Sequence, residues 1–123
     1  MFLPIVAKAE DFAKQVSIAG VGFLYIERTG ELTSVHFSVS HRLSRPVTAI
    51  TFALTFRSPD GTVLKTEQYR HQFQYMHQGK MWGSQLSRDE VYQVKHNIYP
   101  NVQGFCPGTC GTIQVRAVSV DTE

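Results

Sequence analysis

Apolar and polar residues alternate along two successive runs between residues 35 and 64. The apolar positions are Val35, Phe37 and Val39 in the first run, and Ile50, Phe52, Leu54 and Phe56 in the second. Alternation with a period of two is typical of a β-strand with one buried face. The polar connection Leu43-Ser-Arg-Pro46 separates the two runs, and its proline cannot donate a hydrogen bond to a neighbouring strand. The pattern therefore predicts two strands joined at a corner.

The turn Ser58-Pro-Asp-Gly61 follows the second run. Proline presets the φ angle of a turn position, and glycine adopts the positive φ that other residues resist. A strand that ends in such a turn favours an antiparallel partner directly after it. We interpret the corner at Pro46 as a crossing from one sheet to another.

Strand-like runs continue on both sides of this pair. They cover residues 16–26, 62–76, 92–98 and 113–120, and residues 1–7 are expected to form an edge strand. Residues 8–15 have the composition for one helical turn, residues 78–85 are expected to form a loop or a short strand, and residues 100–111 are the longest irregular stretch. About seven or eight short strands with a turn roughly every ten residues predict an all-β sandwich. We expect one domain over residues 1–123.

Two interruptions of the strand pattern predict local irregularities. Gly20 and Gly22 break the phase of the run over residues 16–26, which indicates a bulge or a close approach of another group to the backbone. The last run changes phase near Ala117 and Val118.

The order Ser-Arg-Pro-Val, Ile-x-Phe-x-Leu-x-Phe and Asp-Gly-x-Val-Leu resembles the immunoglobulin-like domains of the FxLYD type. Phe52-Ala-Leu54-Thr-Phe56 and Pro59-Asp-Gly61 stand at the corresponding places, and Leu86–Glu90 matches a later loop of that pattern. The resemblance covers residues 32–120, and the Tyr-Asp part of the family's motif is absent. It implies an antiparallel immunoglobulin-like β-sandwich that serves as an accessory or binding module.

Composition and charge narrow the classes of function. The chain has 123 residues, 42% hydrophobic and 18% charged, with a net charge of +2. Its Lys and Arg residues are scattered, whereas a nucleic-acid binder of this size usually has a basic stripe, so no nucleic acid is expected as a partner. No apolar run reaches the roughly 20 residues that span a bilayer. Residues 1–7 lack the basic start and cleavage site of a signal peptide, so we expect a cytoplasmic location.

Cys106 and Cys110, in Cys-Pro-Gly-Thr-Cys, allow three interpretations. They form a disulfide that closes a five-residue loop, or they are two free thiols of an intracellular protein. Alternatively they are two zinc ligands, since a Cys-x3-Cys spacing is usual in zinc sites. A closed zinc site needs four ligands, so His96 and either His71 or His77 would complete it.

The sequence contains no recognisable catalytic motif. A nucleophilic pair of Cys106 or Cys110 with His96 is conceivable, but nothing in the sequence lowers the pKa of either thiol. There is no glycine-rich phosphate loop, no Gly-x-Ser-x-Gly motif and no His-x-x-x-His pair. We therefore expect a protein that is not an enzyme and has no cofactor.

The segment from Tyr69 to Trp82 is rich in aromatic residues and methionine. One interpretation places these side chains in the core. The other is a binding surface, because Tyr, Trp and Met are enriched at protein interfaces. We expect residues 78–85 to be exposed and Tyr75, Met81 and Trp82 to contact a protein partner or a second copy. A homodimer is also expected from long edge strands. The function predicted is therefore a non-enzymatic binding or structural module that acts through protein contacts, and the alternative is a small zinc protein.

Overall fold

A computed structural model describes residues 12–123. The edge strand expected at residues 1–7 lies outside the described residues, as does the first half of the helical turn expected at 8–15. Of the remaining half, Phe12–Gln15 forms a turn in which the Gln15 amide donates to the Phe12 carbonyl oxygen over 2.9 Å. The described residues contain eight strands: β1 (Val16–Ile26), β2 (Glu31–His41), β3 (Val47–Arg57), β4 (Val63–Gln72), β5 (Gln74–His77), β6 (Lys80–Gly83), β7 (Tyr92–Val102) and β8 (Thr112–Thr122).

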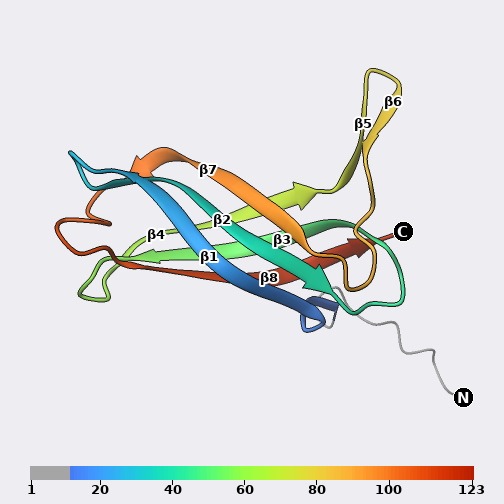
Figure 1. The fold of residues 1–123 in the computed structure, drawn as a ribbon, viewed down its shortest axis with the longest axis horizontal. Helices are drawn as coiled ribbons and strands as arrows, with labels where there is room; N and C mark the ends of the chain where they lie inside the picture. The colour runs from blue at the N-terminus through green and yellow to red at the C-terminus, as the bar shows by residue number, and fades with distance from the viewer. Residues whose placement is uncertain (1–11) are drawn as a thin grey trace, which may run out of the picture.

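Six of these strands form two three-stranded antiparallel sheets that lie face to face (Figure 1). The first sheet has the order β1-β2-β7 and the second the order β4-β3-β8, while β5 and β6 pair only with each other. The chain passes from the first sheet to the second between β2 and β3, at Pro46, as expected. The all-β, antiparallel prediction is confirmed, and so is the expected number of strands.

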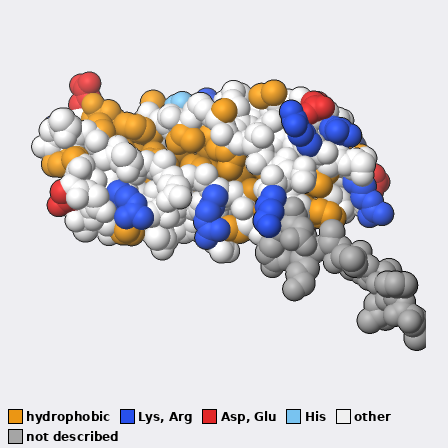
Figure 2. All heavy atoms as spheres, turned by 90° about the horizontal axis from the view of Figure 1, so that it is seen from below, with side chains coloured by type: hydrophobic (Ala, Val, Ile, Leu, Met, Phe, Trp, Pro, Cys, Tyr) orange, Lys and Arg blue, Asp and Glu red, His pale blue; other side chains and the backbone are white. Residues whose placement is uncertain are grey.

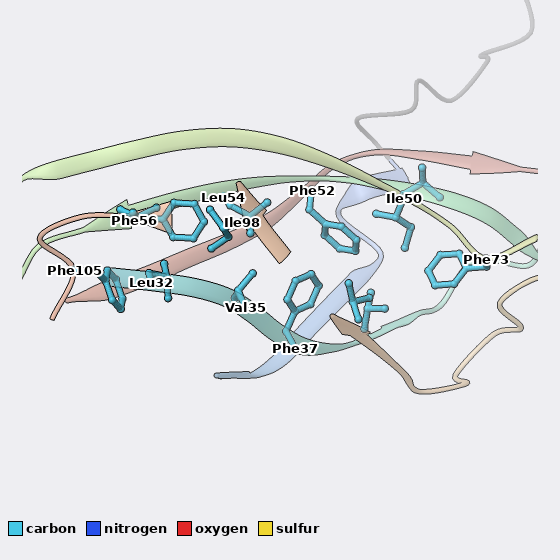
Figure 3. Packing of buried hydrophobic residues seen from close by; sticks show 14 of the residues in the cluster. Leu32, Val35, Phe37, Ile50, Phe52, Leu54, Phe56, Phe73, Ile98 and Phe105 are labelled. Atoms are coloured by element: carbon cyan, nitrogen blue, oxygen red, sulfur yellow. The ribbon is translucent and has the colours of Figure 1, made fainter. Parts of the chain in front are cut away.

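The core lies between the two sheets (Figure 3). Leu32, Val35 and Phe37 on β2 face Ile50, Phe52, Leu54 and Phe56 on β3, and all seven side chains are buried. The Phe37 and Phe52 rings meet edge to face, with their centroids 4.8 Å apart. The alternating positions seen in the sequence are therefore the inward faces of the two central strands.

Both predicted irregularities are present. The register between β1 and β2 shifts between Ala19 and Gly22, and a Cβ atom on Gly22 would clash with the imidazole ring of His36. Gly22 is therefore a position where a side chain packs directly on the backbone. The register between β3 and β8 shifts where Thr51 and Phe52 face Ser119 and Ala117, which leaves Val118 as the extra residue.

Two expected boundaries were wrong. Residues 62–76 were predicted as one strand, but β4 ends at Gln72, the chain bends at Phe73 and β5 begins at Gln74. Residues 100–111 were predicted to be irregular throughout, whereas β7 continues to Val102. The described residues include no helix that is long and apolar enough to cross a membrane.

Candidate protein-binding hairpin

The hairpin formed by β5 and β6 stands out from one end of the two sheets (Figure 1). Its two-residue turn consists of Gln78 and Gly79, with φ angles of 51° and 76°. Positive φ at both central residues defines a type I′ turn, whose twist matches that of paired strands. The Gln-Gly turn therefore has the twist that a two-residue hairpin needs.

Cross-strand pairs place large apolar residues on both faces of the hairpin. Tyr75 pairs with Trp82 on one face, and Met76 pairs with Met81 on the other. The exposed fractions are 46% for Tyr75, 63% for Met76, 55% for Met81 and 48% for Trp82. The indole Nε1–H of Trp82 donates to the His77 carbonyl oxygen over 3.3 Å, which holds the ring against its own hairpin.

The base of the hairpin is attached firmly to β3. Phe73 is buried and donates its amide hydrogen to the Thr48 carbonyl oxygen, while Leu86 and Val47 exchange two backbone hydrogen bonds of 2.8 and 3.0 Å. Gly83 has a φ of 74°, and a Cβ atom there would clash with the Phe73 carbonyl oxygen. The four apolar side chains therefore project from an anchored support.

The expected exposure of Met81 and Trp82 is confirmed. Residues 78–85 were expected to form a loop or a short strand, and they contain the short strand β6. Tyr75 is exposed too, whereas Phe73, two residues before it, is buried in the core. Sequence reasoning did not single out Met76 as a surface residue. The sequence did contain a signal, because Met76 and Met81 stand at equal distances from the Gln-Gly turn and so pair across a two-residue hairpin.

A second group of side chains bridges the two sheets along the side where β4 and β7 meet. His71 contacts two tyrosine hydroxyls, Tyr69 through Nδ1 at 2.7 Å and Tyr92 through Nε2 at 3.3 Å. His96 lies 3.0 Å from a Glu67 carboxylate oxygen, and its ring stacks on Tyr69 with centroids 4.1 Å apart. We call these five residues the polar seam.

Burial shifts the pKa values of two residues in the polar seam, His71 and Tyr69. It lowers the pKa of His71 below its ordinary value of 6.5, because the charged imidazolium loses solvation. Burial also raises the pKa of Tyr69 above 10.0, and the charge of Tyr92 raises it further. A neutral His71 has one donor and one acceptor nitrogen, which suits a bridge between two hydroxyls. The arrangement closes this side of the sandwich with hydrogen bonds.

Cys106 and Cys110 form a disulfide. The loop that they close continues from Phe105, which is buried and meets Phe23 edge to face at 5.0 Å. The Cys106 amide donates to the Gly30 carbonyl oxygen over 3.0 Å, and the Gly111 amide donates to the Phe105 carbonyl oxygen over 2.7 Å. The disulfide therefore fastens a loop that covers one end of the core.

The residues proposed for a zinc site are not brought together. His96 contacts Glu67 and Tyr69 in the polar seam, and His77 is exposed on the hairpin. Within residues 12–123, no group of three or more His, Cys, Asp and Glu side chains is arranged to hold a metal ion. A disulfide also leaves neither sulfur as the thiolate that zinc requires. The zinc hypothesis therefore requires reduced cysteines and stays a prediction.

His41 differs from the other histidines because it is buried, with 1% of its surface exposed. Its Nε2–H donates to the Leu86 carbonyl oxygen over 2.7 Å, and its Nδ1 accepts the Leu43 amide hydrogen over 3.2 Å. These two partners require a neutral ring with the proton on Nε2. His41 thus joins the corner between the sheets to the base of the hairpin.

Comparison with known proteins supplies no relative from which a role could be transferred. No protein-family model, no curated protein and no solved structure matches this chain. The candidate site therefore rests on the geometry of the hairpin alone.

Proposed function

We propose that this protein is a non-enzymatic binding module that contacts a partner protein through the β5–β6 hairpin. The observation that carries the proposal is the exposure of Tyr75, Met76, Met81 and Trp82 on a hairpin that projects from the sandwich. Large apolar side chains concentrated on one exposed element are typical of interaction sites. Trp and Tyr are also the residues that most often dominate binding energy at interfaces.

The placement of these residues on both faces favours a partner with a groove. A flat surface would cover either the Tyr75–Trp82 face or the Met76–Met81 face, whereas a groove covers both pairs. Methionine side chains adapt to irregular apolar surfaces, and the aromatic pair offers large contact area at a small entropy cost. The hairpin is held by its turn and by its base, which is bonded to Thr48 and Val47, and this reduces the ordering cost of binding.

The tip of the hairpin argues for a protein and against a lipid bilayer. The residues at the tip are His77, Gln78, Gly79 and Lys80, all polar or lacking an apolar side chain. Insertion into a bilayer would bury the Lys80 ammonium group before the apolar pairs reached the hydrocarbon, which is unfavourable. A protein groove can leave the tip in water while it covers the sides.

We also infer that the sheets have immunoglobulin-like connectivity. If β1, β2, β3, β4, β7 and β8 are taken as strands A, B, C, C′, E and F, the orders β1-β2-β7 and β4-β3-β8 correspond to A-B-E and C′-C-F. This correspondence supports the fold expected from the FxLYD-type resemblance. The hairpin then occupies the connection between C′ and E. The disulfide departs from that pattern because it lies within one loop instead of joining strands B and F.

Site-specific photo-crosslinking tests the binding function and captures the partner in the same experiment. A photoreactive phenylalanine analogue replaces Trp82 in one variant and Val91 in a matched control, in cells that naturally produce the chain. Val91 is 66% exposed and lies outside the hairpin, so it reports non-specific capture. We expect a discrete adduct with another protein from position 82 and none of the same mass from position 91.

The purified partner then provides the quantitative test. Trp82→Ala should weaken binding about 30-fold, as expected for an interface residue that contributes about 2 kcal/mol. Val91→Ala should leave the affinity unchanged. Identical adducts from both positions, or an affinity insensitive to Trp82→Ala, would refute the proposal. An adduct only with a second copy of this chain would replace the heterologous partner by self-association.

A further inference from the structure

Strand β1 is an edge strand without charged residues. Its sequence, VSIAGVGFLYI, contains no Asp, Glu, Lys or Arg, and within residues 12–123 it pairs only with β2. The other edge strands of the two three-stranded sheets carry charges: Lys65, Glu67 and Arg70 on β4, Lys95 on β7, and Arg116 and Asp121 on β8. Charged side chains protect an edge from pairing with another chain. The free edge of β1 lacks this protection.

The second half of β1 also presents apolar side chains to solvent. Leu24 is 63% exposed, and Tyr25 and Ile26 are 39% exposed. After the irregularity at Gly20 and Gly22, β1 continues as a strand to Ile26. Its pairing with β2 shifts once more between Leu24 and Tyr25, where Thr33 of β2 is the extra residue. Figure 2 shows the molecule from below relative to Figure 1, and apolar side chains are gathered in a strip on that face.

We propose that a second copy of this chain pairs with the free edge of β1 in antiparallel orientation, around a twofold axis at Leu24. Leu24 then faces Leu24 of the second copy, and Phe23 faces Tyr25 of the second copy on either side of the axis. Phe23 and Tyr25 already lie on one face of β1, with centroids 6.0 Å apart. The order aromatic-Leu-aromatic is thus self-complementary, and aromatic pairs across strands are stabilising.

The charge distribution favours a second copy as the occupant of this edge. Around a twofold axis each strand meets its own sequence in reverse, so a charge close to the axis meets the same charge on the second copy. Like charges directly opposite each other destabilise a strand pair. Strand β1 has no charge at any position and avoids this cost, whereas β4, β7 and β8 would incur it at Arg70, Lys95 or Arg116 if one of these lay at the axis.

The available area sets the strength of the association. With about 200 Å² for a fully exposed large side chain, the exposed parts of Val21, Leu24, Tyr25 and Ile26 amount to about 350 Å² per copy. The pair of copies would bury about 700 Å² from these side chains plus the unpaired backbone of both strands. This total approaches the approximately 1,000 Å² expected of a specific interface. We therefore expect a weak dimer whose population depends on concentration.

Sedimentation of the full chain between about 10 μM and 1 mM tests the proposal, because a dimer with an interface near the lower size limit dissociates in this range. The wild-type chain should shift from monomer toward dimer as its concentration rises. Leu24→Lys places two lysine side chains opposite each other at the axis, with their Cβ atoms about 5 Å apart, and the repulsion of like charges should lower the association constant at least about tenfold. Leu24→Glu should do the same.

Mixing the two variants separates a twofold interface from simple loss of apolar surface. Equal amounts of Leu24→Lys and Leu24→Glu should form a heterodimer at concentrations where each alone is monomeric, because opposite charges then meet at the axis. Val91→Lys, a control of similar exposure outside β1, should dimerise like the wild type. Trp82→Ala should also dimerise normally, so this surface and the hairpin are distinguished.

A wild-type chain that is monomeric at 1 mM would overturn the proposal. So would a dimer that survives Leu24→Lys, a mixture of the two variants that stays monomeric, or a dimer that Trp82→Ala abolishes.

Discussion

Loss of the disulfide between Cys106 and Cys110 should lower stability by a modest, calculable amount. The bond closes a loop of five residues, because the two cysteines are four positions apart. In the chain-entropy description, a cross-link that closes so short a loop stabilises the folded state by about 2 kcal/mol, through restriction of the unfolded chain. The double variant Cys106→Ala and Cys110→Ala should therefore be about 2 kcal/mol less stable than the oxidised wild type.

The fold itself should survive this change. Phe105 remains buried at the end of the core, and the hydrogen bond from the Cys106 amide to the Gly30 carbonyl oxygen involves backbone atoms only. Both anchors hold the loop without the sulfur–sulfur bond. For a chain of 123 residues, a loss of about 2 kcal/mol corresponds to a fall in Tm of about 8 °C, from an unfolding entropy of about 2.1 cal/mol/K per residue.

Thermal unfolding followed by circular dichroism provides the assay, with wild type measured with and without reductant. Intact mass before and after reduction establishes the starting state, since reduction of one disulfide adds about 2 Da. The reduced wild type and the double variant should both melt about 8 °C below the oxidised wild type. A change below about 0.5 kcal/mol would refute the entropic account. A loss of the folded spectrum at 25 °C would show that the disulfide holds more than its loop.

Two further predictions concern the hairpin and the polar seam. Gly83→Ala should destabilise the protein by about 1–2 kcal/mol more than Gly79→Ala. Both residues have positive φ, but only at position 83 would the added Cβ atom meet the Phe73 carbonyl oxygen. Urea unfolding of both variants measures the difference, and equal losses of stability would contradict the prediction. His71 should titrate by NMR with a pKa below 6.5, since burial disfavours its charged form. The folded state then binds fewer protons than the unfolded state, so stability should fall as the pH drops below 6.5 toward the folded pKa. A His71→Gln variant should lose this dependence. An NMR midpoint at or above 6.5 would contradict the lowered pKa of His71.

The sequence predicted the central part of the fold because that part depends on local periodicity. The alternation of Val35, Phe37 and Val39 with polar residues fixes which face of β2 is buried, whatever the rest of the chain does. The glycines at 20 and 22 likewise indicated an irregularity that follows from their own backbone freedom. These features do not depend on distant residues.

The missed features depend on contacts between residues far apart in sequence. The run from Tyr69 to Tyr75 alternates without interruption, and nothing in that pattern marks the bend at Phe73, whose side chain is buried in the core between the sheets. The burial of His41 likewise depends on Leu86, whose carbonyl oxygen accepts its hydrogen bond and which lies 45 positions later. No spacing in the sequence indicates such pairings.

The candidate site also has features that the sequence predicts and features that depend on the folded structure. Exposure of Met81 and Trp82 was predictable because they stand between two glycines in a short polar segment. The polar seam was not, because Tyr69 and His71 meet Tyr92 only after two sheets are in place. The state of the cysteines also remained open in the sequence, since a disulfide and two thiols fit the same spacing.

The way in which the hairpin joins the sandwich has a consequence for variation among proteins of this architecture. Residues 74–85 leave the sheets after Phe73, bonded to Thr48, and return at Leu86, bonded to the adjacent Val47. This segment leaves and rejoins the sheets at neighbouring residues, so its length hardly affects the strands. Doubling the length of a loop costs only about 0.6 kcal/mol in free energy of unfolding. The sandwich can therefore accommodate hairpins of other lengths and sequences at this position. If the hairpin binds a partner as proposed, replacement of this segment would change the choice of partner while the core residues stay the same.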